Sequence, residues 1–281
     1  MIDLHTHTNV SDGTDSPFEL INKAMSQGIT TLAITDHDSI DGWQEAERAL
    51  RPGLQLVKGA EISTLTTDGI SVHMLGLLFD GGNEAMITML NDTKDQRIPR
   101  MKKMIELLNR DGITISMDDV MAAAPEGATV GRPHLADALV ATGLLKSRDE
   151  AFQGLLNNDS KYYVEHVAPT PEEAIRIIKE AGGVSVIAHP FASRRGQIVS
   201  VDTFATLVQA GLNGVEVDHR DHNAQERADL LHVTRELNLV ATGSSDYHGT
   251  GKLNSLGENL TNPAEWERLE SMARERRVIS K

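Results

Sequence analysis

The chain has 281 residues, no cysteine and a formal net charge of −14. This length allows one large α/β domain, or a domain with a sizeable insertion, and the lack of cysteine excludes disulfides, zinc fingers, iron–sulfur clusters and thiol nucleophiles. Any metal ion must therefore be held by His, Asp and Glu, which suits zinc, manganese or iron. The negative charge argues against a protein that coats duplex nucleic acid or an anionic membrane.

No apolar run approaches the roughly 20 residues that span a bilayer. The N-terminal residues contain no basic and apolar leader of the kind that directs secretion. We therefore expect a cytoplasmic protein that has no membrane partner.

Short apolar runs predict seven strands, at residues 2–8, 30–37, 54–63, 70–79, 183–190, 214–219 and 239–246. Helix start signals stand between several of them. Ser16, Pro17 and Glu19 predict a capping box and a helix that ends at Gly28. The same pattern returns at Thr170, Pro171, Glu173 and Gly182, and at Asn262, Pro263 and Glu265.

Apolar runs that alternate with helices indicate a parallel sheet buried on both faces, and seven strands suggest a closed or nearly closed barrel. Strands and helices do not alternate in residues 82–166. This segment is mainly helical and includes "RIPRMKKMIELLNRDG" and "RPHLADALVATGLL". We therefore expect an α/β barrel formed by residues 1–81 and 167–281, with a helical insertion, residues 82–166, over one end.

Ionisable residues recur where the predicted strands end. His5 and His7 lie two residues apart, so their side chains share one face of the first strand. The other runs contribute Asp12, Asp36, His37, Glu61, His73, His189, Asp246 and His248. Each alone has an ordinary explanation as a core histidine, a helix cap or a solvated strand end. Together, at the strand ends where α/β barrels build active sites, they would repel one another without a cation, which predicts a multinuclear metal site.

The motifs "DLHTHTNVSDGTDSP", "AITDHD", "GAEIS", "VIAHP" and "GSSDYHG" resemble, in order, those of the PHP (polymerase and histidinol phosphatase) family of metal-dependent phosphoesterases. The resemblance implies a distorted (β/α)7 barrel and a three-metal centre with nine ligands. The first ion takes His5, His7 and Asp246 and shares Glu61 with the second, which also takes His73 and His189; the third takes Asp12, His37 and His248.

Closely spaced divalent ions can hold a bridging hydroxide and stabilise in-line displacement at phosphorus, without a covalent enzyme intermediate. Asp36 is expected to support catalysis by orienting a ligand. The group that protonates the leaving oxygen is left open between His222, His189 and a metal-bound water.

Arginine forks suit phosphate oxygens, although a solvated surface charge is the ordinary alternative for each arginine. The string "GRPH", with Arg132 and His134, resembles a phosphate-contacting segment in the branch of the family that acts on nucleotides. Further candidates for substrate binding follow two strand ends: Arg194, Arg195, His219, Arg220 and His222. His166 and His232 are assigned no role.

The leading hypothesis is a phosphatase that removes the 3′-phosphate of 3′,5′-bisphosphonucleosides, such as adenosine 3′,5′-bisphosphate, and releases AMP and phosphate. A 5′-to-3′ exonuclease acting on the termini of short RNA or DNA is the second hypothesis, and histidinol-phosphate phosphatase the third. An amidohydrolase is less favoured because Glu61 takes the place of a bridging lysine. A complete ligand set argues against a non-catalytic scaffold.

Overall fold

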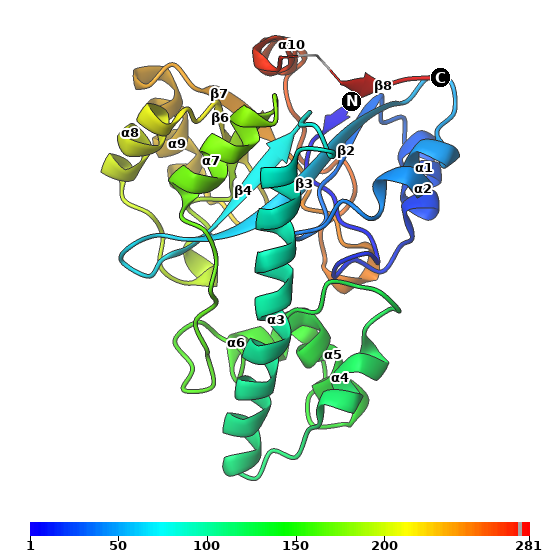
Figure 1. The fold of residues 1–281 in the computed structure, drawn as a ribbon, viewed down its shortest axis with the longest axis vertical. Coiled ribbons are helices and arrows are strands. Elements are labelled where there is room, and N and C mark those ends of the chain that lie inside the picture. The colour runs from blue at the N-terminus through cyan, green and yellow to red at the C-terminus, as the bar shows by residue number, and fades with distance from the viewer. Residues whose placement is uncertain (275–276) are drawn as a thin grey trace.

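The computed structural model describes residues 1–274 and 277–281 and shows an α/β barrel with a group of helices below it (Figure 1). The strands follow one another around the sheet in chain order, and β8 pairs with β3. They are β1 (Ile2–Asp3), β2 (Thr31–Ile34), β3 (Gln55–Leu65), β4 (Ser71–Leu77), β5 (Val184–Ala188), β6 (Gly214–Asp218), β7 (Val240–Gly243) and β8 (Val278–Ile279).

The barrel is nearly closed at its mouth by the chain that follows β1. The backbone N–H of His7 donates to the carbonyl of Tyr247 at 2.8 Å, and Thr6 forms an isolated bridge with the same residue. The segment after β1 thus lies beside the segment after β7. The expected seven-stranded barrel is confirmed, while β8 has no counterpart among the predicted strands.

The expectation of a wholly parallel sheet is wrong at β4. This strand pairs antiparallel with both β3 and β5. Only residues 66–70 connect β3 to β4, and the turn is held by the Thr66 N–H, which donates to the carbonyl of Ile70 at 2.9 Å. A parallel connection needs about a dozen residues or more, so this short loop forces a hairpin. As a result, His73 reaches the mouth near the start of its strand.

Six helices pack around the barrel: α1 (Pro17–Ser26), α2 (Trp43–Ala49), α7 (Pro171–Glu180), α8 (Val201–Ala210), α9 (Ala224–Glu236) and α10 (Pro263–Met272). The predicted capping boxes of α1 and α7 are confirmed. At α10 the prediction is only partly right, because Asn262 caps the helix but Glu265 accepts from the Ala241 N–H at 3.3 Å. That carboxylate ties the helix to β7 and forms no box.

A second group of helices comprises α3 (Glu84–Arg110), α4 (Met117–Ala123), α5 (Arg132–Ala141) and α6 (Arg148–Gln153). Residues 98–166, which contain the second half of α3 and the other three helices, are called the cap here. Helix α3 runs from the barrel into the cap as one rod (Figure 1), with Pro99 on an exposed position where water can satisfy the carbonyl left without an N–H partner. The cap has its own apolar cluster, which includes Met104, Leu135 and Leu139. The boundaries 82 and 166 of an insertion domain stay a prediction.

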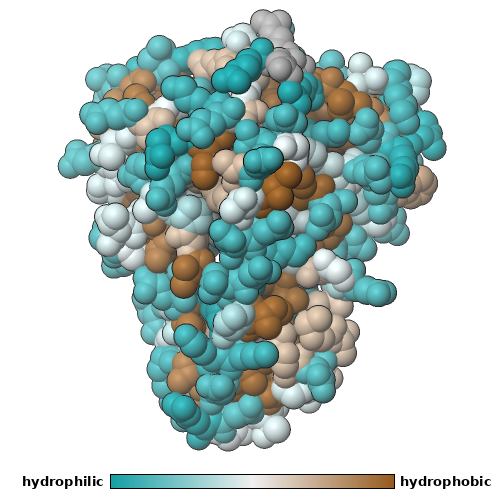
Figure 2. Space-filling model, viewed as in Figure 1, coloured by the Kyte–Doolittle hydropathy of each residue, from teal (hydrophilic) through white to brown (hydrophobic). Residues whose placement is uncertain are grey.

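Figure 2 shows a mainly hydrophilic face, with separate hydrophobic patches over the barrel and over the cap. Within residues 1–274 and 277–281, no helix has both the length and the apolar character needed to cross a membrane.

Candidate metal centre

All nine side chains expected to bind metal converge at the mouth of the barrel, and Glu61 lies at their centre. Its Oε2 lies 3.2 Å from His5 Nε2 and 3.0 Å from His7 Nε2. Its Oε1 lies 2.8 Å from His73 Nδ1 and 3.1 Å from His189 Nε2. One carboxylate therefore faces two groups of imidazoles, which is the arrangement needed to share two ions.

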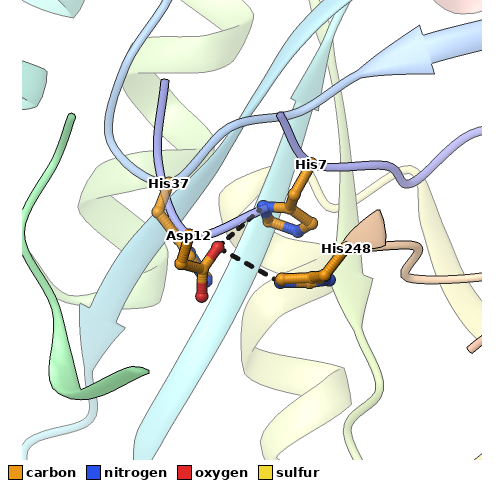
Figure 3. Close-up of side chains that lie close together, drawn as sticks. All are labelled: His7, Asp12, His37 and His248. Atoms are coloured by element: carbon orange, nitrogen blue, oxygen red, sulfur yellow. Dashed lines mark ion pairs between the residues drawn. The ribbon is translucent and has the colours of Figure 1, made fainter. Parts of the chain in front are cut away.

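A second carboxylate, Asp12, organises another group (Figure 3). Its Oδ1 lies 3.2 Å from His248 Nε2 and 3.6 Å from His7 Nδ1, and its Oδ2 lies 3.7 Å from His37 Nε2. His7 thus stands between this group and the one around Glu61, because its two ring nitrogens face different carboxylates. The family resemblance implies a single ion for His7, and this double position is a feature that the motifs did not reveal.

The donor set fits divalent cations. Three groups place one donor atom from each member within 4.8 Å of the others: His7, Asp12, His37 and His248; His5, His7, Glu61 and Asp246; and His37, Glu61 and His73. Oδ1 of Asp246 is buried and hydrogen-bonds no described group, although Nε2 of His5 and of His7 each lie 3.5 Å away. Such spacing is long for a hydrogen bond and suits atoms arranged around one ion.

The electrostatics also favour positive charge at this place. Burial raises the pKa of the Glu61 carboxyl, but the imidazoles of His37, His5 and His73 outweigh it and hold that pKa well below its usual range. Burial likewise lowers the pKa of His7, yet the nearby carboxylates of Asp246 and Glu61 raise it to about 9. Buried carboxylates that stabilise protonated imidazoles in this way can stabilise metal ions in their place.

Asp36 acts on the loop that precedes Asp12. Its carboxylate accepts from the Thr8 N–H at 2.8 Å, the Thr8 hydroxyl at 2.7 Å and the Ser11 hydroxyl at 2.7 Å. Gly13 completes this tight loop, because a Cβ there would lie 2.7 Å from the carbonyl oxygen of His7. The geometry favours an orienting role for Asp36 and gives it no place in the wall of the pocket, so a direct catalytic role finds no support.

Glu216 is a buried carboxylate that the motifs did not single out. Burial raises its pKa, but His5 outweighs that effect and lowers the pKa to about 2. Its Oε1 lies 3.1 Å from His5 Nδ1, and its Oε2 accepts from the backbone N–H of His189 at 2.8 Å. A glutamate in the middle of the apolar run "GVEVD" was the available signal.

A pocket of about 710 Å³ opens over the metal-binding side chains and extends to the cap. Of the predicted substrate residues, Arg132, Arg194, Arg195 and Arg220 line it, while His134, His219 and His222 do not. Arg195 pairs with Asp221 and Asp246, and Arg220 pairs with Glu258. Lys252, which was not predicted from the sequence, also lines the pocket. Its Nζ lies 3.0 Å from Asp246 Oδ2.

The three histidines outside the pocket wall have structural partners. Nδ1 of His222 bonds to the Val217 carbonyl at 2.9 Å, and its Nε2 accepts from the Phe191 N–H at 3.2 Å. With both ring nitrogens engaged, His222 is poorly placed to protonate a leaving group or to bind substrate. His219 accepts from the Asp221 N–H at 3.0 Å and faces Asp246, and His134 accepts from the Gly131 N–H at 3.0 Å.

Two arginines in the cap wall have no carboxylate partner among residues 1–274 and 277–281. The guanidinium carbons of Arg100 and Arg132 each lie 5.3 Å from the ring centre of Tyr163. Their hydrogen bonds go to the carbonyls of Val164 and Leu156 and to the Asn158 amide oxygen. Burial and the charge of Arg132 lower the pKa of Arg100 to about 10. The pocket thus has a cationic wall facing the acidic metal centre.

Comparison with known proteins agrees with this site. The model of the PHP domain family matches residues 3–96. Over 260 residues, the chain is 33% identical to a 5′-3′ exoribonuclease of Haemophilus influenzae, covering 92% of this chain and 93% of that one. The chain belongs to the PHP family.

Another relative, a 3′,5′-nucleoside bisphosphate phosphatase of Chromobacterium violaceum, is 32% identical over 253 residues, which is 89% of this chain and 88% of the relative. A solved structure from Bifidobacterium adolescentis, assigned as a metal-dependent phosphoesterase, is 40% identical and superposes with a TM-score of 0.90 over 96% of both chains. The protein is therefore a PHP phosphoesterase, a hydrolase of phosphoric esters, as the motifs predicted.

Proposed function

We propose that this PHP phosphoesterase hydrolyses a phosphomonoester of a small nucleotide, with the 3′-phosphate of 3′,5′-bisphosphonucleosides as its main substrate. The observation that carries the proposal is the pairing, in one pocket, of the metal centre with Arg100 and Arg132. Two guanidinium groups without carboxylate partners favour a second phosphate at the cap end. A substrate with phosphates at both ends satisfies both regions.

The donor set favours three divalent ions of manganese, zinc or iron, held as the family resemblance implies. When bound, they supply activated water and neutralise charge on the phosphoryl oxygens. In the reaction a water oxygen bonds to phosphorus, the bond to the 3′-oxygen breaks, and that oxygen takes a proton. The cap residues contribute by fixing the distal phosphate, which orients the scissile one over Glu61 and the surrounding imidazoles.

The net charge also bears on the size of the substrate. Three divalent ions would bring the charge of −14 only to about −8, which still repels a long polyanion at a distance. A small nucleotide, with AMP and phosphate as products, fits this balance better than duplex nucleic acid. A cytoplasmic location and the lack of a membrane partner are part of the same proposal.

A 5′-to-3′ exonuclease on short RNA or DNA is the second candidate. The similarity to the exoribonuclease of Haemophilus influenzae favours it. In that case the terminal nucleotide occupies the same pocket, and the two activities differ in how much chain extends beyond the scissile bond. Histidinol-phosphate phosphatase is a weaker alternative, because its substrate has a single phosphate and would leave the cap arginines without an anion.

The test is product release by manganese-loaded protein offered adenosine 3′,5′-bisphosphate, a 5′-phosphorylated short oligonucleotide or histidinol phosphate, with products separated by chromatography. We expect the bisphosphate to give AMP and phosphate while the oligonucleotide stays intact. Stepwise release of mononucleotides at a comparable rate would make the exonuclease the primary activity. Preferential hydrolysis of histidinol phosphate would overturn both nucleotide proposals.

A further inference from the structure

Glu216 lies in the middle of β6 and is fully buried, with an exposed fraction of 0%. Successive side chains of a strand point to opposite faces, so Val215 and Val217 enter the apolar core while Glu216 points the other way, toward the metal-binding side chains. Burying a carboxylate is costly unless hydrogen bonds compensate it. Its two oxygens must therefore have specific partners.

One oxygen holds the ring of His5. With Oε1 of Glu216 at 3.1 Å from Nδ1, the opposite nitrogen, Nε2, faces Glu61 and Asp246 at 3.2 and 3.5 Å. A proton kept on Nδ1 by a carboxylate leaves the lone pair of Nε2 free to bind a metal ion. Glu216 thus selects the ring nitrogen that His5 offers to the first ion.

The other oxygen holds the backbone of His189. This residue has a φ of +31°, in a region that residues other than glycine rarely adopt because it is strained. The N–H of His189 donates to Oε2 of Glu216 at 2.8 Å, and its ring places Nε2 3.1 Å from Glu61 Oε1. The carboxylate therefore stabilises a strained backbone that aims a ligand of the second ion.

We propose that Glu216 is a positioning residue that couples two of the three metal positions, because it holds His5 of the first ligand set and His189 of the second. No hydrogen bond or ion pair joins it to the third set, Asp12, His37 and His248. Asp36 is its counterpart there, since it holds the loop before Asp12 through Thr8 and Ser11. This inference rests on the proposed metal centre and is independent of the substrate.

The experiment compares Glu216→Gln, Asp36→Asn and the control Asp218→Asn, which changes an exposed carboxylate of the same strand that pairs with Arg227. Zinc affinity is measured by competition with a chromogenic chelator, and occupancy at each position by anomalous diffraction at the zinc edge. In Glu216→Gln we expect two ions to bind about 10- to 100-fold more weakly and the third to bind as in the wild type. Asp36→Asn should weaken the third alone, and Asp218→Asn none.

Wild-type affinity at the first two positions in Glu216→Gln, or equal weakening at all three, would overturn the proposal. Wild-type protein that binds no divalent ion would overturn the metal centre itself, so the two failures are distinguishable. Should Glu216→Gln not fold, Glu216→Asp replaces it: the charge remains, but the shorter side chain can reach only one of the two partners. Weaker binding at one or both of the first two positions supports the coupling, and unchanged binding at both overturns it.

Discussion

The mouth of the barrel and the cap are stabilised in opposite ways. At the mouth, buried carboxylates and imidazoles crowd around Glu61, and His189 and Asp246 adopt positive φ values of +31° and +51°. The cap is ordered by an ordinary apolar cluster, in which Leu135 and Leu139 are fully buried. The mouth carries buried charge that a bound cation would stabilise, together with strained backbone, whereas apolar packing holds the cap. In the proposed function, the barrel supplies the chemistry and the cap selects the substrate.

Metal removal tests this contrast most strongly. Chelation is expected to abolish phosphate release and to lower the Tm, since one ion at a thousand times its Kd stabilises a protein by about 4 kcal/mol. Hydrogen exchange should rise in the segments around Asp12 and Asp246 and stay unchanged in α4 and α5. An equal rise in the cap would show that the two regions are one cooperative unit.

Glu61→Ala should remove the carboxylate shared by two ligand sets. We expect hydrolysis to be lost and the bound metal to fall by two ions per chain, measured by phosphate release and elemental analysis. Glu47→Ala is the matched control, because Glu47 is 43% exposed and pairs with Lys58 at the surface. Near wild-type turnover in Glu61→Ala would contradict the assignment of Glu61 as the central ligand.

Arg132→Ala should affect selection more than chemistry. Removing a guanidinium that makes charge-assisted hydrogen bonds to a phosphate is expected to raise the KM for the bisphosphate about 10- to 100-fold. The kcat should change by a few-fold at most, and kinetics with a 3′-monophosphate should barely change. Arg110→Ala, at the end of α3, is the control. A loss of kcat with unchanged KM would place Arg132 in the chemical step.

The smallest effects are expected from two matched capping boxes. Ser16 caps α1 on the barrel and Ser116 caps α4 in the cap. Each change to Ala should lower the free energy of unfolding by about 1 kcal/mol. Hydrogen exchange should increase around α1 in the first variant and around α4 in the second, with phosphate release unchanged in both. Effects that spread across both regions would argue against separate stabilisation.

Patterns in the sequence predicted much of the fold and of the metal centre. Apolar runs marked seven strands, and the residues after them met at one mouth because strand ends converge in a barrel. The direction of β4 was missed because an apolar run does not reveal its orientation; that depended on a five-residue loop. Strand β8 was missed because two residues make too short a pattern.

Residues that act through others were harder to predict. Glu216 stands alone in its strand, and only the fold brings it beside His5, 211 residues away in the chain. Lys252 lies 6 residues after Asp246, but no motif marked it. Conversely, His222 has the residue type and position of a catalytic group, but its ring is engaged by backbone atoms. Which polar side chain is free depends on contacts between segments far apart in the chain, and these are absent from local patterns.

The β3–β4 hairpin also bears on how the ligand set is assembled during synthesis. It brings His73 beside Glu61 across only 12 residues, whereas the contact of His5 with Glu216 spans 211. Contacts that are close in sequence form early because little chain entropy is lost, and distant ones form late. Six of the nine ligands, from His5 to His73, emerge from the ribosome before the cap begins. The nascent chain therefore carries an incomplete set of ligands until β5, β6 and β7 close the barrel.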